Sequence, residues 1–206
     1  MDRRLLIVSG LAAAAAASGP ASAQNRDEGG GPPANGGETG PGDQPAETYS
    51  HDEIVHSVSD FFGVAAENVG ALVERIFRDN GRPTAYIAGT EGGGAFFFGL
   101  RYGKGLMYMK DRPRLRVFWQ GPTGGFDWGA NASRVFTLCY NLQYPDAIFR
   151  RFPGVEGSAY FIGGLGVTYQ RADGITLAPI RAGVGLRLGA SVGYLAYSRQ
   201  RNIIPL

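Results

Sequence analysis

Apolar residues follow a helical spacing after residue 49 and a strand-like spacing after residue 83. The first stripe fits one face of an amphipathic helix and consists of Ile54, Val55, Val58, Phe61 and Phe62. Ser50 and Glu53 form a capping box at its start, and Gly63 supplies a left-handed stop. A second apolar face predicts a helix from about Ala65 to Asn80. We therefore expect a pair of helices at the start of the folded region.

The rest of the chain reads as strands that contain many glycines. The expected strand segments are rich in aromatic and apolar residues and cover 84–90, 95–110, 114–120, 133–142, 155–169 and 176–190. Asp173-Gly174 predicts a hairpin turn, and Pro145 to Phe152 predicts one short helix. Repeated Gly within strands is typical of strongly coiled sheets, and closure removes exposed edges. We expect a mainly β fold, a small closed antiparallel β-barrel flanked by two N-terminal helices and one short helix.

The N-terminal 48 residues do not fit this pattern. Arg3 and Arg4 precede an apolar run of 13 residues and the small-x-small sequence Ala21-Ser22-Ala23. This order predicts a signal peptide at 1–23 that is cleaved after Ala23, since 13 residues are too few to span a bilayer. Residues 24–48 are rich in Gly, Pro and acidic residues, so we expect a disordered acidic linker. Residues 49–206 then form a single domain in the periplasm, and no later segment is apolar enough for a transmembrane helix.

The amino-acid composition limits which catalytic groups, metal sites and partners the protein can have. Gly supplies 33 of 206 residues, whereas there are two His and one Cys, and the net charge is only +2. One Cys excludes a multi-cysteine zinc site, and so balanced a charge argues against a nucleic-acid partner. His51 and His56 are five residues apart, which does not suit chelation on one helix face. Cys139 lies within an apolar strand, which favours a buried thiol, so no catalytic residue, metal ligand or cofactor is expected.

The densest positive cluster follows residue 109. Lys110, Arg112, Arg114 and Arg116 would share one face of an extended strand, with Leu115 and Val117 directed into the core. Such a face could contact anionic lipid headgroups, and each cation would contribute about 1 kcal/mol. The alternative is a solvated hairpin connection, which Pro113 favours.

Two long runs carry a family resemblance. Val117 to Leu142 (VFWQGPTGGFDWGANASRVFTLCYNL) and Leu177 to Leu195 (LAPIRAGVGLRLGASVGYL) resemble the envelope integrity protein A family, periplasmic proteins of Alphaproteobacteria. The resemblance covers about residues 49 to 200 and implies a helix-flanked β-barrel, without known catalysis, that helps to maintain the envelope. GTEGGGAFFFGLRYGKG (Gly89 to Gly105) is distantly similar to SYLF-type domains, which implies phospholipid binding.

Three functional classes follow from these features. The first is a non-enzymatic periplasmic protein that supports envelope integrity through weak binding of lipid or another envelope component. The second is a small outer-membrane β-barrel, which export and alternating strands would also fit. The third is an envelope-modifying enzyme. The sequence leaves the oligomeric state and the physiological ligand open.

Overall fold

The computed structural model describes residues 45–95, 99–123, 132–155, 158–182 and 193–202, all within one compact unit. The predicted signal peptide and most of the predicted linker lie outside these residues. No helix among the described residues is long and apolar enough to cross a membrane.

Two α-helices open the described chain, as the sequence predicts. Helix α1 spans His51–Phe62, and α2 spans Ala66–Asn80. Both hydrogen bonds of the capping box are present, from the backbone of Glu53 to the side chain of Ser50 and the reverse. Gly63 adopts a left-handed conformation, φ 69°, and its N–H donates to the carbonyl of Ser59. Local sequence signals therefore determine both ends of α1.

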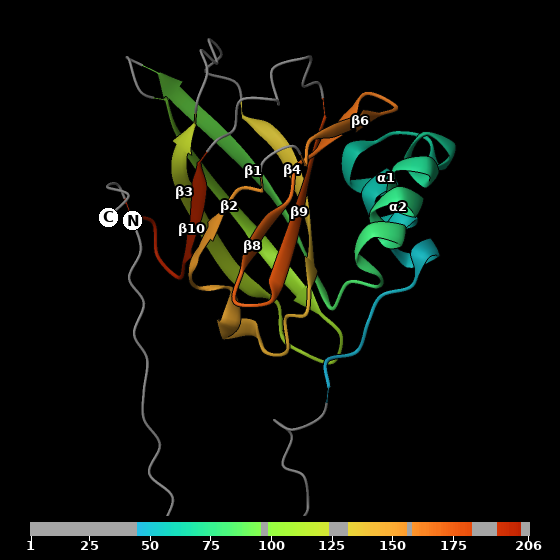
Figure 1. Cartoon of the computed structure of the whole chain (residues 1–206), viewed down its shortest axis with the longest axis horizontal. Helices are drawn as coiled ribbons and strands as arrows, with labels where there is room; N and C mark the ends of the chain where they lie inside the picture. The colour runs from blue at the N-terminus through green and yellow to red at the C-terminus, as the bar shows by residue number, and fades with distance from the viewer. Residues whose placement is uncertain (1–44, 96–98, 124–131, 156–157, 183–192, 203–206) are drawn as a thin grey trace, which may run out of the picture. The chain divides into compact units, whose positions relative to one another are not determined.

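Within the described residues, ten strands and a short 3₁₀ helix follow (Figure 1). The strands are β1 Ala85–Ala95, β2 Gly99–Met109, β3 Leu115–Thr123, β4 Ser133–Tyr140, β5 Arg151–Pro153, β6 Tyr160–Ile162, β7 Leu165–Val167, β8 Gln170–Ala172, β9 Ile175–Ala182 and β10 Tyr194–Ser198, with helix η1 Pro145–Ile148 before β5. They form one antiparallel sheet in the order β5-β10-β3-β2-β1-β4-β9-β7-β6, with β8 paired to β9. The fold is mainly β with two α-helices.

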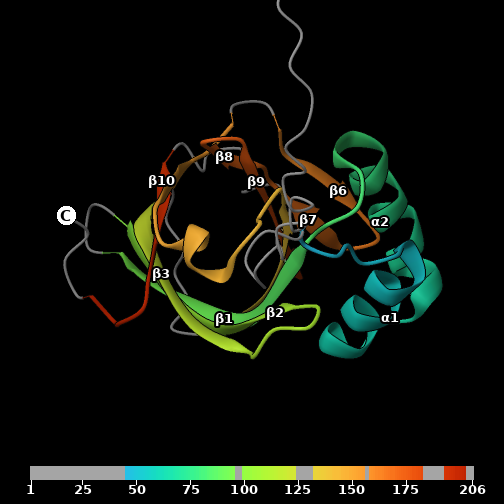
Figure 2. The same cartoon turned by 90° about the horizontal axis from the view of Figure 1, so that it is seen from below.

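The sheet curls strongly, so that strands distant in the chain approach one another (Figure 2). Gly154, just after β5, forms an isolated antiparallel bridge with Gln170 of β8. The N–H of Val155 also donates to the carbonyl of Tyr169 at 2.9 Å. Helix η1 lies at one end of the curl (Figure 1), and its Ile148 is fully buried in the inner core.

Two hydrophobic cores result because both faces of β4 and β9 are covered. The inner core includes alternate residues such as Val135 and Cys139 of β4 and Leu177 of β9. The outer core places Phe136, Leu138 and Ile180 against the apolar stripes of α1 and α2. These strands therefore read as continuous apolar runs rather than as an alternation of apolar and polar residues.

One predicted strand and the predicted short helix need correction. The segment 155–169 is not one strand, because Gly163 and Gly164 both have positive φ, form a turn and divide it into β6 and β7. The short helix ends at Ile148 rather than Phe152, because β5 begins at Arg151 and pairs with β10. The predicted turn at Asp173-Gly174 is present, with both residues at positive φ. Residues 183–190 of the last predicted strand lie outside the described residues.

Candidate functional site

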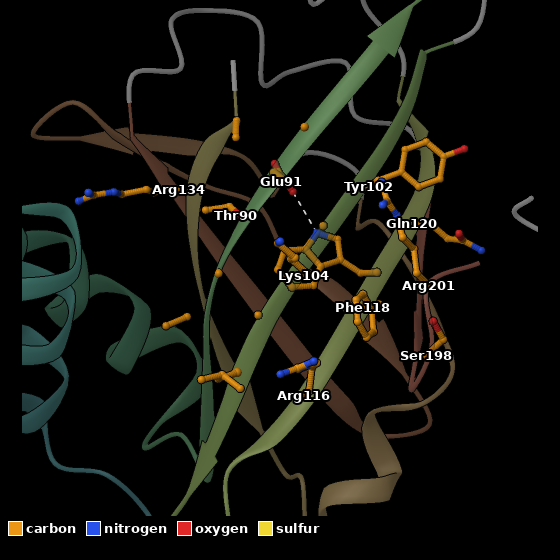
Figure 3. A pocket seen from close by; sticks show the side chains of 18 of the residues that line it. Thr90, Glu91, Tyr102, Lys104, Arg116, Phe118, Gln120, Arg134, Ser198 and Arg201 are labelled. Atoms are coloured by element: carbon orange, nitrogen blue, oxygen red, sulfur yellow. Dashed lines mark hydrogen bonds between the residues drawn. The ribbon is translucent and has the colours of Figure 1, made fainter. Parts of the chain in front are cut away.

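A groove of about 1050 Å³ lies on the outer face of strands β1, β2 and β3 (Figure 3). Phe61 at the end of α1 and Arg134 of β4 line it beyond β1. Ser198 of β10 and the following Arg201 and Asn202 line it beyond β3. The groove therefore spans five neighbouring strands, in the order β4-β1-β2-β3-β10.

A row of directly paired residues crosses this groove. In order, the row is Arg134, Thr90, Lys104, Phe118 and Ser198, one residue from each strand. Paired residues of adjacent antiparallel strands lie on the same face of the sheet. The row therefore presents, on one surface, two cations, two hydroxyls and an aromatic ring. Arg116 of β3 is two residues before Phe118 and extends from the same face.

Three of the four cations that line the groove differ from most described Lys and Arg side chains in having no partner within the described part of the chain. Most described Lys and Arg side chains contact a carboxylate, a carbonyl oxygen or an aromatic ring: Lys110, Arg75, Arg82, Arg101, Arg114, Arg134, Arg150, Arg151, Arg181 and Arg199. Lys104, Arg116 and Arg201 are exposed, and none has a hydrogen-bond or ion-pair partner in the described part of the chain. Arg134 donates to the carbonyl of Phe61 at 2.9 Å and thereby joins α1 to β4. Three unpaired cations are thus gathered in one recess.

The carboxylate among the described lining residues, that of Glu91, is directed away from these cations. Glu91 of β1 is 6% exposed, and its side chain meets Arg181 of β9 inside the curl. One Arg181 nitrogen lies 3.3 Å from Glu91 Oε2, and Arg101 Nε lies 3.7 Å from Oε1. Burial by itself would raise the pKa of Glu91, but the two guanidiniums hold the pKa below its usual range. Among the described lining residues, therefore, no carboxylate offsets the charge of Lys104, Arg116 and Arg201.

Glycines allow the indole of Trp119 to lie directly beneath the groove. Trp119 Nε1 donates to Glu91 Oε2 at 3.2 Å, and its ring covers the inner side of β2 and β1. A Cβ at Gly103 would overlap the indole ring, and a Cβ at Gly89 would lie 2.7 Å from Trp119 Cη2. Gly92 faces open space, with nothing within 4 Å of such a Cβ. Two of these glycines thus serve close packing, whereas Gly92 belongs to the floor of the groove.

The structure divides the four cations that the sequence groups together. Lys110 to Arg112 form a turn in which Asp111 has φ 56°, so the chain is not extended from 110 to 116. Lys110 pairs with Glu53 at 2.9 Å and, with Arg112, lines a separate hollow of about 310 Å³. The guanidinium carbon of Arg114 lies 5.4 Å from the ring centroid of Tyr108. Only Arg116 lines the larger groove, so the expected shared face is limited to Arg114 and Arg116.

Sequence reasoning missed Lys104, Phe118 and Arg201 as members of one surface. Lys104 stands alone between two glycines, and Arg201 follows the last strand. Only the register of β2 against β3 and of β3 against β10 brings them together. The inward direction of Leu115 and Val117 is confirmed, since both pack in the inner core.

The cysteine and the two histidines, the other candidates for chemistry in the sequence, have structural surroundings in the fold. Burial strongly raises the pKa of the Cys139 thiol, which is fully buried. His56 Nε2 pairs with Asp60 at 3.1 Å on α1, whereas the ring of His51 packs against Phe77. No group of three or more His, Cys, Asp or Glu residues in the described ranges could hold a metal ion.

Comparison with known proteins agrees with this architecture. A β-barrel-like, uncharacterized protein from Brucella abortus superposes with a TM-score of 0.71 and 43% sequence identity. The match covers 77% of this chain and 99% of the Brucella chain. A search of curated proteins found no match.

The model of a protein family, described as envelope integrity protein A, matches residues 47–206. This range contains both helices and every described strand. The chain therefore belongs to the envelope integrity protein A family.

Proposed function

We propose that this protein is a non-enzymatic periplasmic protein that supports envelope integrity by binding an anionic envelope component in the groove. The observation that carries the proposal is the gathering in one recess of Lys104, Arg116 and Arg201, three cations without a hydrogen-bond or ion-pair partner among the described residues. Unpaired exposed cations around an aromatic side chain suit a ligand that carries both anionic groups and apolar surface.

The expected binding is weak and reversible. Three cations near an anionic surface contribute about 3 kcal/mol in total. Covering roughly 100 Å² of apolar surface around Phe118 adds about 2.5 kcal/mol. Together these terms correspond to a dissociation constant of roughly 0.1 mM. A groove of this kind suits a ligand that is abundant, or one that repeats the same anionic group along its length.

The described outer surface argues against an outer-membrane barrel. Lys104 extends outward at the middle of β2, and a Lys that faces lipid at mid-depth costs about 2–4 kcal/mol. Helices α1 and α2 cover the outer face of β4 and β9. We place the protein in the periplasm, after cleavage of a signal peptide following Ala23. Release by osmotic shock tests this location, and retention in the outer membrane after a carbonate wash would contradict it.

We infer a role without catalysis, because the described side chains of the groove do not form a catalytic arrangement. Its described lining contains no His or Cys, and its one carboxylate, Glu91, is ion-paired inside the sheet. The hydroxyl of Ser198 donates to the carbonyl of Gln200 at 2.7 Å rather than to a base.

We also propose that the sheet closes into a barrel, which the bridge between Gly154 and Gln170 supports. A closed barrel gives the groove a rigid floor.

Titration of the protein with inorganic tripolyphosphate, followed by backbone amide NMR, tests anion binding in the groove. We expect saturable shifts at Lys104, Arg116 and Ser198 and their loss in the Lys104→Glu/Arg116→Glu variant. The matched control is Arg78→Glu/Arg171→Glu, which changes the net charge equally at two exposed cations of α2 and β8 that are outside the groove. Shifts centred on Lys110 and Arg112, or equal effects of both double variants, would contradict the proposal.

A further inference from the structure

The shape of the groove limits the kind of anionic ligand that can reach its floor. From β4 to β10 it crosses five strands, about 19 Å at the usual spacing of about 4.8 Å between strands. Along the strands its outward-facing residues occupy three cross-strand rows, which span about 13 Å at about 3.3 Å per residue. The groove is therefore longer across the strands than along them.

Both ends of the long direction are bounded by side chains. Arg134 lies at one end and Arg201 at the other (Figure 3). Phe61, at the end of α1, and Asn202, which follows Arg201, also line the groove. A single extended chain can lie along the groove between these ends, over the exposed side chains of Thr90 and Lys104.

The side chains of the central row determine the chemistry of that chain. Arg134 and Lys104 are two strands apart, about 10 Å, with the exposed hydroxyl of Thr90 between them. Beyond Lys104 come the ring of Phe118 and the hydroxyl of Ser198. Separated cations suit separated anions, the hydroxyls suit a hydroxyl-bearing ligand, and an aromatic ring packs against the C–H face of a sugar.

A fatty acyl chain fits these residues poorly. The apolar side chains of the lining, such as Ala88, Leu106 and Phe118, are interrupted by Lys104 and Arg116 and do not form a continuous channel. Bound acyl carbons would remove these cations from water without pairing them. A phosphate chain would pair with the cations but would make no use of Phe118, Thr90 or Ser198.

We propose that the groove binds an acidic glycan, as one extended chain that lies across strands β4, β1, β2, β3 and β10. The inference rests on the proposed function, since it names the class of the anionic component. The carboxylate or phosphate groups of the glycan pair with Lys104, Arg116 and Arg201, and one sugar ring packs on Phe118.

A ladder of oligogalacturonates, from the disaccharide upward, tests this proposal by calorimetry and NMR with the mature protein. We expect affinity to rise with chain length until the chain spans the groove, and then to stop rising. The fully methyl-esterified oligomers have the same sugar backbone without charge and are expected not to bind. Phe118→Ala and Phe118→Leu both remove the ring, and each should weaken oligogalacturonate binding about five- to tenfold while leaving tripolyphosphate affinity unchanged.

The outcomes separate this inference from the proposed function. The glycan assignment is wrong, and anion binding stands, under two joint conditions. The first is that tripolyphosphate or phosphatidylglycerol vesicles bind in the groove as tightly as the longest oligogalacturonate. The second is that both Phe118 variants bind this oligogalacturonate as tightly as the wild-type protein does. If none of these probes binds at Lys104 and Arg116, both proposals are wrong. Tighter binding of vesicles than of every soluble chain would assign the groove to a membrane surface.

Discussion

Glu91 and Arg181 come from strands that are not neighbours, and their side chains meet over β4 inside the curled sheet. Trp119 completes this contact by donating a hydrogen bond to the same carboxylate. The arrangement links the fold to the groove, because it holds the one carboxylate of the lining on the inner side of the sheet. The outer side of the groove lining is consequently left with cations alone among its described charged side chains.

Removal of the Glu91 carboxylate should destabilise the protein strongly. Glu91→Ala leaves the buried Arg181 and the mostly buried Arg101 without their shared counter-ion, which costs about 3–5 kcal/mol. The free energy of unfolding from urea titration measures the effect. Glu74→Ala on the exposed face of α2 is the control, with an expected change within about 0.5 kcal/mol. A similarly small change for Glu91→Ala would show that the pair does not stabilise the fold.

The capping box predicts a defined pH dependence. The backbone N–H of Ser50, and next the ammonium of Lys110, lower the pKa of Glu53 to about 2. A carboxylate whose pKa is lower in the folded state stabilises the fold above its unfolded pKa of about 4.3, and this stabilisation is lost as pH falls through the folded pKa.

Glu53→Gln keeps the capping hydrogen bond but removes the charge. The wild-type protein should therefore have the higher melting temperature near neutral pH, and the two temperatures should converge as pH falls from about 4 to 2. Circular dichroism melts over this range measure the difference. A difference that stays constant with pH would mean that the charge of Glu53 does not contribute.

Substitution by Ala should destabilise the protein at Gly103 but not at Gly92. Gly103→Ala forces a Cβ into the indole of Trp119 and should lower the free energy of unfolding by about 1–3 kcal/mol. Gly92→Ala places its Cβ in open space and should change stability by less than about 0.5 kcal/mol. Urea titrations of both variants decide the point. Equal effects would show that the indole does not pack on Gly103.

Cys139 should be unreactive in the folded protein. Its side chain is fully buried, and burial raises the pKa of the thiol well above its usual range. We expect no reaction with a chromogenic disulfide reagent under native conditions and complete reaction in concentrated urea. Rapid native labelling would show that β4 opens readily or that this thiol is accessible.

Features fixed by nearby residues could be predicted from the sequence, and features fixed by strand pairing could not. The capping box of α1, its end at Gly63 and the Asp173-Gly174 turn depend on a few adjacent residues. The division of 155–169 at Gly163 and Gly164 was missed, because alternate apolar residues continue through the turn. Both faces of β4 are buried, so alternation alone could not assign its outer residues to the helices.

The groove depends on register to an even greater extent. Lys104 and Phe118 are 14 positions apart in the chain and are directly paired in the sheet. The run from Lys110 to Arg116 attracted attention because its charges are adjacent in sequence, yet the turn at Asp111 separates them. Proximity in sequence therefore identified one groove residue, Arg116, and missed the others.

The central claim is that envelope integrity depends on the cations of the groove, and complementation tests it most directly. A strain that lacks this protein would receive the wild-type gene, Lys104→Glu/Arg116→Glu or the charge-matched Arg78→Glu/Arg171→Glu, with periplasmic protein levels measured by immunoblot. Survival on a membrane-active detergent is the readout. We predict that the control variant restores survival to the wild-type level and that the groove variant, present in equal amount, does not. Full restoration by the groove variant would contradict the account.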